Sequence, residues 1–168
     1  SLLWQAESDV VEASSRPAPA PLVRATHLVA GRIQLWACDA QPLLWAYPLD
    51  ASALRLKVEL AGHGVERIID IAADGADGVW VLARRDGRAL ALNIDCAGHA
   101  GRCIELPMPC GIPRGLTWAA GRLVLLDATG TLLSWVDPLA PGAVMDVRLN
   151  SVRPGAAASV ISSDTTAR

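Results

Sequence analysis

Hydrophobic residues in this chain come in short runs that are separated by clusters of Gly, Asp and Pro. The pattern is most regular between positions 65 and 107, where the apolar runs are RIIDIAA, GVWVLAR, RALALNID and RCIELP. The segments between them, ADGAD, RDG and CAGHAG, are typical of hairpin loops. The runs GVWVLA and, further on, GRLVLL are almost continuously apolar, as expected of strands covered on both faces. Residues 65–107 therefore predict four consecutive antiparallel strands.

The same unit recurs on both sides, at residues 22–60 and 112–149. Two sets of markers support the repeat: glycines that open the second strand (Gly31, Gly78, Gly121) and aspartates that close the third (Asp50, Asp95, Asp137). A period in the forties with four strands per repeat is typical of β-propeller blades. We therefore predict an all-β fold of three four-stranded blades, with second strands near 31–37, 78–83 and 121–127. Propellers typically close with four to eight blades, so these three are expected to belong to a larger propeller.

The two ends of the chain differ from the blades within residues 22–150. Residues 1–21 predict a partial strand pair followed by a linker, because three prolines stand at alternate positions in SSRPAPAP and lack ladder donors. Residues 151–168 are small, polar and aperiodic, which predicts a flexible linker or terminus. The chain begins with Ser1 and shows no targeting signal, so it is expected to be part of something longer. Its expected location is the cytoplasm or an assembled particle.

Composition and charge exclude several classes of partner. The net charge is −2, and no basic tract offers a surface for nucleic acid or for an anionic membrane. No apolar run approaches the roughly 18–20 residues of a membrane-spanning helix. With 52% hydrophobic residues the chain can bury a substantial core. Recognition of other proteins is the interaction we expect.

One group of residues has the ligand types that zinc prefers: Cys96, His99, Cys103 and Cys110. Its spacing, C-x2-H-x3-C-x6-C, is not a standard one, and Cys110 belongs to the connection between blades. Cys96 and Cys103 lie at the two feet of one predicted hairpin, where an oxidant could join them in a disulfide. The four cysteines of the chain are too few and too unevenly spread for a disulfide scaffold, so we expect unlinked thiols and no metal.

The remaining polar residues give no catalytic site and no cofactor site. Carboxylates recur along the blades (Asp70, Asp74, Asp77, Asp86, Asp95, Asp127, Asp137, Asp146). Asp74, Asp77 and Asp86 are expected in turns beside Gly, where an Asp side chain caps its own backbone. Asp50, Asp95 and Asp137 occupy one equivalent place in each blade, so we interpret these carboxylates as structural. His27 and His63 are isolated, and neither a nucleophile elbow nor a phosphate-binding glycine loop is present. Five of the six tryptophans lie in the blades and are expected to fill the space between sheets.

The blade sequence resembles the NHL and related six-bladed propellers over residues 22–149. The residues that carry this resemblance are Gly111, Pro113, Gly115 and Leu116 at the start of a blade, and Asp74, Gly78, Val79, Trp80 and Val81 before and within a second strand. NHL-type propellers serve as protein-binding, RNA-binding and lactonase scaffolds. The hydrolases among them would carry Glu, Asn and Asp around a central metal, for which the sequence shows no counterpart; Asn93 and Asn150 are its only asparagines.

A narrower resemblance is to propellers of bacterial phage tail-like, contractile particles. Residues 70–82 and 90–95 are similar to their phrase "DLAxAPDGGVWVLDR…WALD", and residues 1–4 are faintly similar to a second phrase. This resemblance implies a non-catalytic structural or protein-docking module; the alternative is a lactonase-type hydrolase with a metal at the ring axis. The expected partners are other subunits or further blades of a longer chain. They would cover apolar residues of the outermost blades, among them Trp36, Leu126 and Trp135.

Overall fold

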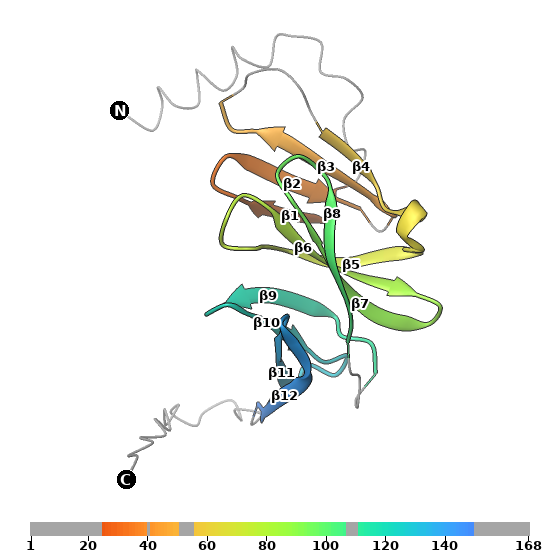
Figure 1. The fold of residues 1–168 in the computed structure, drawn as a ribbon. Helices are drawn as coiled ribbons and strands as arrows, with labels where there is room; N and C mark the ends of the chain where they lie inside the picture. Colours follow the sequence, from red (N-terminus) through yellow and green to blue (C-terminus); the bar gives the residue numbers. More distant parts are fainter. Residues whose placement is uncertain (1–24, 40, 51–55, 107–110, 150–168) are drawn as a thin grey trace, which may run out of the picture.

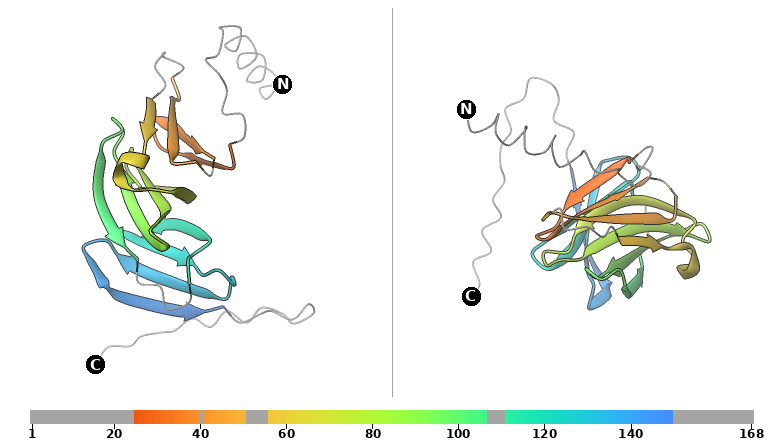
Figure 2. Two further views of the ribbon diagram at one scale, coloured as in Figure 1. Left: turned by 90° about the vertical axis from the view of Figure 1, so that its right-hand side faces the viewer. Right: turned by 90° about the horizontal axis from the view of Figure 1, so that it is seen from above.

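The computed structural model describes residues 25–39, 41–50, 56–106 and 111–149. The expected linkers at residues 1–21 and 151–168, and Cys110, lie outside these ranges. Three four-stranded antiparallel sheets follow one another along the chain, as the repeat predicted. Figures 1 and 2 show them fanned out in chain order, with the second sheet between the other two.

Each sheet contains four strands in sequence order. Sheet A is formed by β1 (His27–Ala30), β2 (Gln34–Cys38), β3 (Leu43–Pro48) and β4 (Leu56–Glu59). Sheet B is formed by β5 (Arg67–Ala73), β6 (Val79–Arg85), β7 (Arg88–Ile94) and β8 (Ala100–Glu105). Sheet C is formed by β9 (Gly115–Ala119), β10 (Arg122–Leu126), β11 (Leu132–Asp137) and β12 (Ala140–Arg148). The second strands coincide closely with those predicted.

Helix is nearly absent from the described ranges. One short 3-10 helix, η1 (Ala61–His63), connects sheets A and B and ends at Gly64, whose φ of 74° is left-handed. In the part of the chain that the structure describes, no helix has the length and apolar character required to cross a membrane.

Two hydrophobic cores lie between the sheets. The first joins the inner face of sheet A to one face of sheet B, and Trp36, Leu44, Val81 and Leu92 are among its members. The second joins the other face of sheet B to sheet C. There Trp80 stacks on Trp118 with ring centroids 5.8 Å apart. Because alternate residues of β6 contribute to different cores, its apolar run is continuous, which confirms the expectation of a strand covered on both faces.

Trp36 corrects one expectation about the outer surfaces. Its side chain is completely buried between sheets A and B, so it needs no partner to cover it. The reason is register: Trp36 pairs with Val29 and Ala46, which face sheet B, whereas its neighbours Leu35 and Ala37 face the other way. Alternate residues of β2 point to opposite faces of the sheet, so membership of an outer blade does not by itself place Trp36 on the outer face.

Candidate functional site at the propeller axis

The first strands of the three sheets lie side by side, β1 next to β5 and β5 next to β9. This is the innermost position of propeller blades, so the three strands mark the axis of the fold. A cavity of about 340 Å³ lies where these strands begin. We call it the axial pocket; its lining is Thr26, His27, Arg67, Ile68, Ile69, Arg84, Ile112, Pro113 and Arg114. All three sheets contribute to it from their first strands or from the residues just before them, and sheet B also contributes Arg84 from β6.

Basic side chains dominate the polar part of this lining. Arg67 and Arg84 stand directly opposite each other on β5 and β6, in an antiparallel pair that places both side chains on the same face. Glu66 lies 3.6 Å from Arg84, measured from Oε2 to Nε. Arg114 extends along the β10–β11 turn, where its guanidinium fills the space above Gly130. Among the described residues, neither Arg67 nor Arg114 has an acidic partner, so the pocket carries uncompensated positive charge.

Asp70 lies next to this pocket and connects sheets B and C. The pairing of β5 with β6 shifts by one residue between Ile68 and Asp70, and such bulges redirect side chains. Its Oδ2 accepts a hydrogen bond of 2.7 Å from the backbone N–H of Leu116 on β9. Its Oδ1 lies 4.0 Å from His27 Nε2 on β1. The Asp70 carboxylate, on β5, therefore accepts a hydrogen bond from β9 and lies near β1.

Asp70 differs from the carboxylates that we interpreted as turn residues or as a repeated position. It lies within a strand, and the matching strands HLVA and GLTWA contain no acidic residue. The turn interpretation holds at Asp74, Asp95, Asp127 and Asp137, whose carboxylates accept backbone N–H bonds from residues two to five positions later. It does not hold at Asp146, which lies within β12 and accepts a bond from the Ser134 hydroxyl, or at Asp77, which lies 3.7 Å from Arg32. The lack of repetition at Asp70 is the signal that could have separated it from them.

Thr26, His27 and Asp70 have the residue types of a nucleophile, a base and an orienting acid. The Thr26 hydroxyl lies 2.9 Å from His27 Nδ1. The distance from His27 to Asp70, however, exceeds the roughly 2.6–3.2 Å expected of a proton relay. Asp70 already accepts two backbone N–H bonds, from Ile71 and Leu116, which fix its position. In this geometry the three groups form an electrostatic contact between blades.

A buried thiol lies near the same strands. Cys38 pairs with His27 across β1 and β2 and belongs to the first core. Burial, with a further contribution from the carboxylates of Asp39 and Asp70, raises the pKa of Cys38 to about 12. The thiol therefore stays protonated at neutral pH and cannot act as a nucleophile there.

The described members of the candidate zinc cluster do not converge on one site. Cys96 and Cys103 are exposed free thiols, and Cys110 falls outside the described ranges. His99 is held by Asp95, with its Nδ1 3.3 Å from the carboxylate Oδ2. Within the described ranges no three His, Cys, Asp or Glu side chains converge as metal ligands would.

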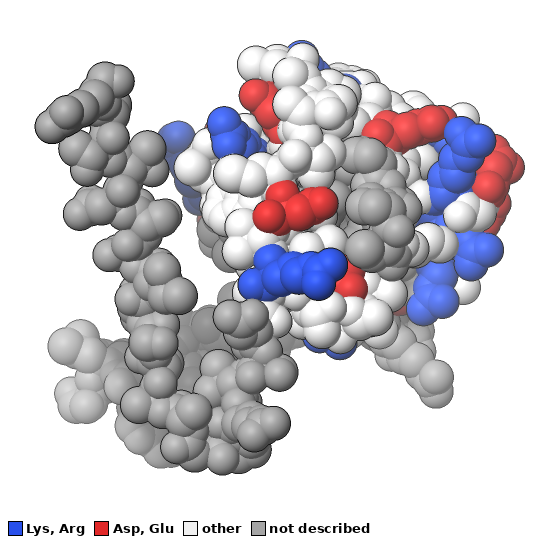
Figure 3. Space-filling view, turned by 90° about the horizontal axis from the view of Figure 1, so that it is seen from below, with Lys and Arg blue, Asp and Glu red and all other residues white. Residues whose placement is uncertain are grey.

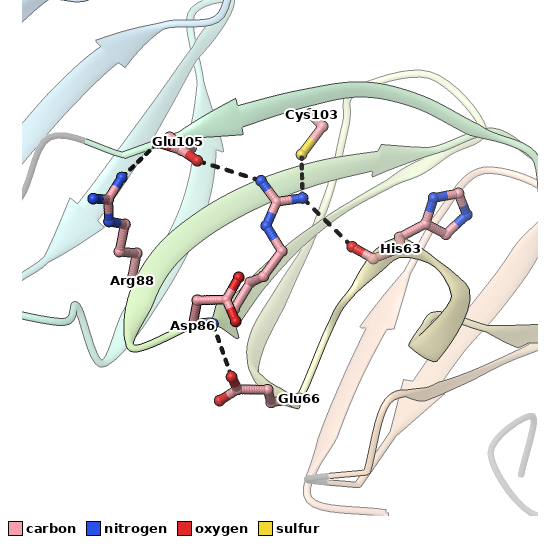
Figure 4. A network of polar contacts seen from close by, with 7 residues as sticks. His63, Glu66, Asp86, Arg88, Cys103 and Glu105 are labelled. Carbon is pink, nitrogen blue, oxygen red and sulfur yellow. Dashed lines mark hydrogen bonds and ion pairs between the residues drawn. The ribbon is translucent and has the colours of Figure 1, made fainter.

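Arg85 organises a polar network that the sequence did not indicate (Figure 4). Its guanidinium lies 3.5 Å from the carbonyl of His63, 4.0 Å from Cys103 Sγ and 3.4 Å from Glu105 Oε1. Glu105 also contacts Arg88, at 3.4 Å. These groups join β6, β7 and β8 to the η1 connection. No local motif marks them, because the contacts join strands that are distant in sequence.

Comparisons with known proteins support the fold alone. No protein-family model matches the chain, and no curated protein matches it either. Among solved structures, it is similar to the structure of streptogramin B lyase, a β-propeller, with a TM-score of 0.56 and 14% identity. The match covers 80% of this chain and 44% of that protein, so the chain spans less than half of its length. The chain therefore has a propeller fold made of three consecutive blades.

Proposed function

We propose that this chain is a non-catalytic structural or protein-docking propeller module of a larger assembly. The observation that carries this proposal is the pair of apolar, partly exposed sheet faces at the two ends of the fan. The resemblance of residues 70–82 to propellers of phage tail-like particles supports an assembly of that kind.

Sheet C presents apolar side chains on the face that points away from sheet B. The cross-strand registers place two rows on this face: Val124, Trp135 and Met145, and Leu126, Leu133 and Val147. Met145 and Val147 are 51% and 45% exposed. In Figure 3, which views the molecule from the side of sheet C, most of the visible described surface is neither acidic nor basic. Leu126 and Trp135, which were expected to need a partner, lie on this face.

Sheet A has a comparable free face. Leu28, Ala37 and Trp45 form one cross-strand row, and Leu35 pairs with Tyr47 in the next. Leu28 is 63% exposed. Trp45 and Trp135 each have a buried indole Nε1 without a hydrogen-bond partner in the structure. Trp36, which lies between sheets A and B, has the same unpaired Nε1, so this feature is not specific to the free faces.

A further propeller blade fits these faces best. The two cores already present are formed by sheet faces that pack against each other through apolar side chains. A fourth four-stranded sheet on sheet C, and another on sheet A, would continue the same type of interface around the axis. Other subunits or a longer chain of the same protein can supply such blades.

Sedimentation velocity of the 168-residue chain tests this proposal. We expect concentration-dependent self-association, and we expect the double variant M145K/V147K, which places two charges on the free face of sheet C, to reduce it. Leu139→Lys is the matched control, because Leu139 is 78% exposed but lies in the turn before β12. A wild-type chain that stays monomeric and melts cooperatively would contradict the proposal.

A lactonase-type hydrolase with a metal at the ring axis is the alternative function. The position of Asp70 and His27 at the axis is the observation that favours it. Elemental analysis of the purified chain distinguishes the two functions. A stoichiometric calcium or zinc ion that survives dialysis and is lost in Asp70→Asn would support the hydrolase.

A further inference from the structure

We propose that the axial pocket binds a small oxyanion that carries several negative charges on phosphate or carboxylate groups. The proposed site is the cationic end of the axis and does not involve the docking faces. The axial pocket has a volume of about 340 Å³, at the lower end of the range for small-molecule sites, which suits a compact ligand. Side chains from all three blades meet there, as ligand sites formed between structural units commonly do.

The cations of the pocket suit planar anionic groups. An arginine guanidinium presents several N–H donors in one plane and binds carboxylate or phosphate through two parallel hydrogen bonds. Arg67 and Arg84 lie side by side on one face of β5 and β6, while Arg114 approaches from the segment before β9. His27 lines the pocket from β1, with its Nδ1 on the Thr26 hydroxyl and its Nε2 near Asp70. An anion in the pocket could therefore contact basic groups from more than one blade.

The pairing of Arg67 with Arg84 is an independent indication. Like charges directly opposite each other on neighbouring strands destabilise a sheet. Glu66 offsets part of this repulsion at Arg84, but Arg67 receives no such compensation from the described residues. An anion bound in the pocket would supply the counter-charge that Arg67 lacks.

The cavity also has apolar walls that limit hydration of a bound anion. Ile68 and Pro113 are buried, and Ile69 and Ile112 are half-buried. Hydrogen bonds between ions are stronger where water is partly excluded. Two carboxylates lie near the pocket without lining it: Asp70 is committed to backbone N–H groups, and Glu66 pairs with Arg84. An anion would therefore bind mainly to Arg67 and Arg114, which have no acidic partner among the described residues.

Isothermal titration calorimetry with pyrophosphate and, separately, with citrate tests the proposal on the full chain. We expect saturable binding of at least one probe; the preferred probe shows whether phosphate or carboxylate groups are recognised. Arg67→Gln should weaken binding by about tenfold or more, as expected for a lost charge-assisted pair. Arg122→Gln is the matched control, because Arg122 is also exposed and begins β10, and it does not line the pocket. The control should bind like the wild-type chain.

Thermal melting gives a second readout that separates a binding role from a structural one. Without a probe, Arg67→Gln should melt about 1–3 °C higher than the wild-type chain, because the repulsion with Arg84 is relieved. The same variant should lose the stabilisation that the probe gives to the wild-type chain. Absence of saturable binding for both probes, an equal loss in Arg122→Gln, or a lower melting temperature for unliganded Arg67→Gln would each overturn the proposal.

Discussion

At the scale of single residues, identical side chains have different roles because their positions in the blade differ. Asp127 follows β10 and accepts bonds from the hydroxyl of Thr129 and from the backbone N–H groups of Thr131 and Leu132. Asp70 lies within a strand and accepts a bond from a different sheet. The first carboxylate stabilises a local turn, whereas the second connects two blades. Substitution of Asp70 should therefore weaken the contact between two blades, whereas substitution of Asp127 should change how stability depends on pH.

Asp70→Ala is expected to destabilise the fold by about 1–3 kcal/mol, because the buried N–H of Leu116 loses its acceptor. Asp70→Asn should lose less, since the amide oxygen can still accept that bond. Urea denaturation followed by tryptophan fluorescence measures both. Asp86→Asn is the control: Asp86 is in an exposed turn with φ of 50°, a conformation that Asn also tolerates. An Asp70→Ala variant as stable as this control would contradict the bridging role.

Asp127 predicts an acid-dependent loss of stability. The Thr129 hydroxyl, followed by the N–H of Leu132, lowers the pKa of Asp127 to about 2 from an ordinary 3.8. A carboxylate whose pKa is lower in the folded chain stabilises the fold above its unfolded pKa, and this contribution is lost as the pH falls through about 4 to 2. Asp127→Asn should therefore show a smaller change in stability over this interval.

Urea midpoints measured at several pH values between 2 and 6 provide the comparison for Asp127→Asn. Asp146→Asn serves as the control, since its carboxylate accepts one exposed hydroxyl bond, from Ser134. If wild-type and Asp127→Asn chains lost stability in parallel, the proposed linkage would be wrong.

At the scale of elements, the connections between strands decide how neighbouring blades fit together. The β6–β7 hairpin turns at Asp86 and Gly87, both with positive φ, and points into solvent. The β7–β8 loop also contains a glycine with positive φ, Gly98, but it packs against β4 of sheet A. One loop is a local turn, and the other is part of the interface between two blades.

Substituting these two glycines by alanine separates the two roles. Gly87→Ala should cost about 1–2 kcal/mol from backbone strain alone, because no atom lies within 4 Å of the added Cβ. At Gly98 the added Cβ would come within 2.8 Å of Leu56 and 3.0 Å of Val58. We therefore expect Gly98→Ala to cost about 1–3 kcal/mol more. Equal losses in denaturant unfolding would show that the loop does not hold sheets A and B together.

The strands and turns could be predicted from sequence because their signals are local. Runs such as GVWVLAR, flanked by Gly and Asp, fix strand type and spacing, and the repeated aspartates fix the turns. The axial pocket could not be predicted, because Arg67, Arg114 and His27 are distant in sequence and meet only when the inner strands assemble. Likewise, the face occupied by Trp36 depends on a register that apolar runs without alternation do not specify.

At the scale of the whole molecule, sheet B differs from its neighbours because both of its faces are covered. Five consecutive residues of β6, Val79–Ala83, are buried, and β7 is buried over most of its length. In contrast, β12 is exposed at every position except Val144, which is half-buried. Sheet A lies between these extremes, since β2 is largely buried and β1 is not. Stability should therefore be distributed unevenly over the three blades.

Hydrogen exchange followed by mass spectrometry should reveal this distribution. Amides of β6 and β7 should exchange most slowly, because exposing them requires both cores to open, whereas β12 forms an outer edge and can separate from β11 alone. If further blades complete the propeller, their addition should slow exchange in β11, β12 and β1 and leave β6 nearly unchanged. Uniform protection of all three sheets in the 168-residue chain alone would contradict this prediction, since it would mean that the free faces of sheets A and C are already covered.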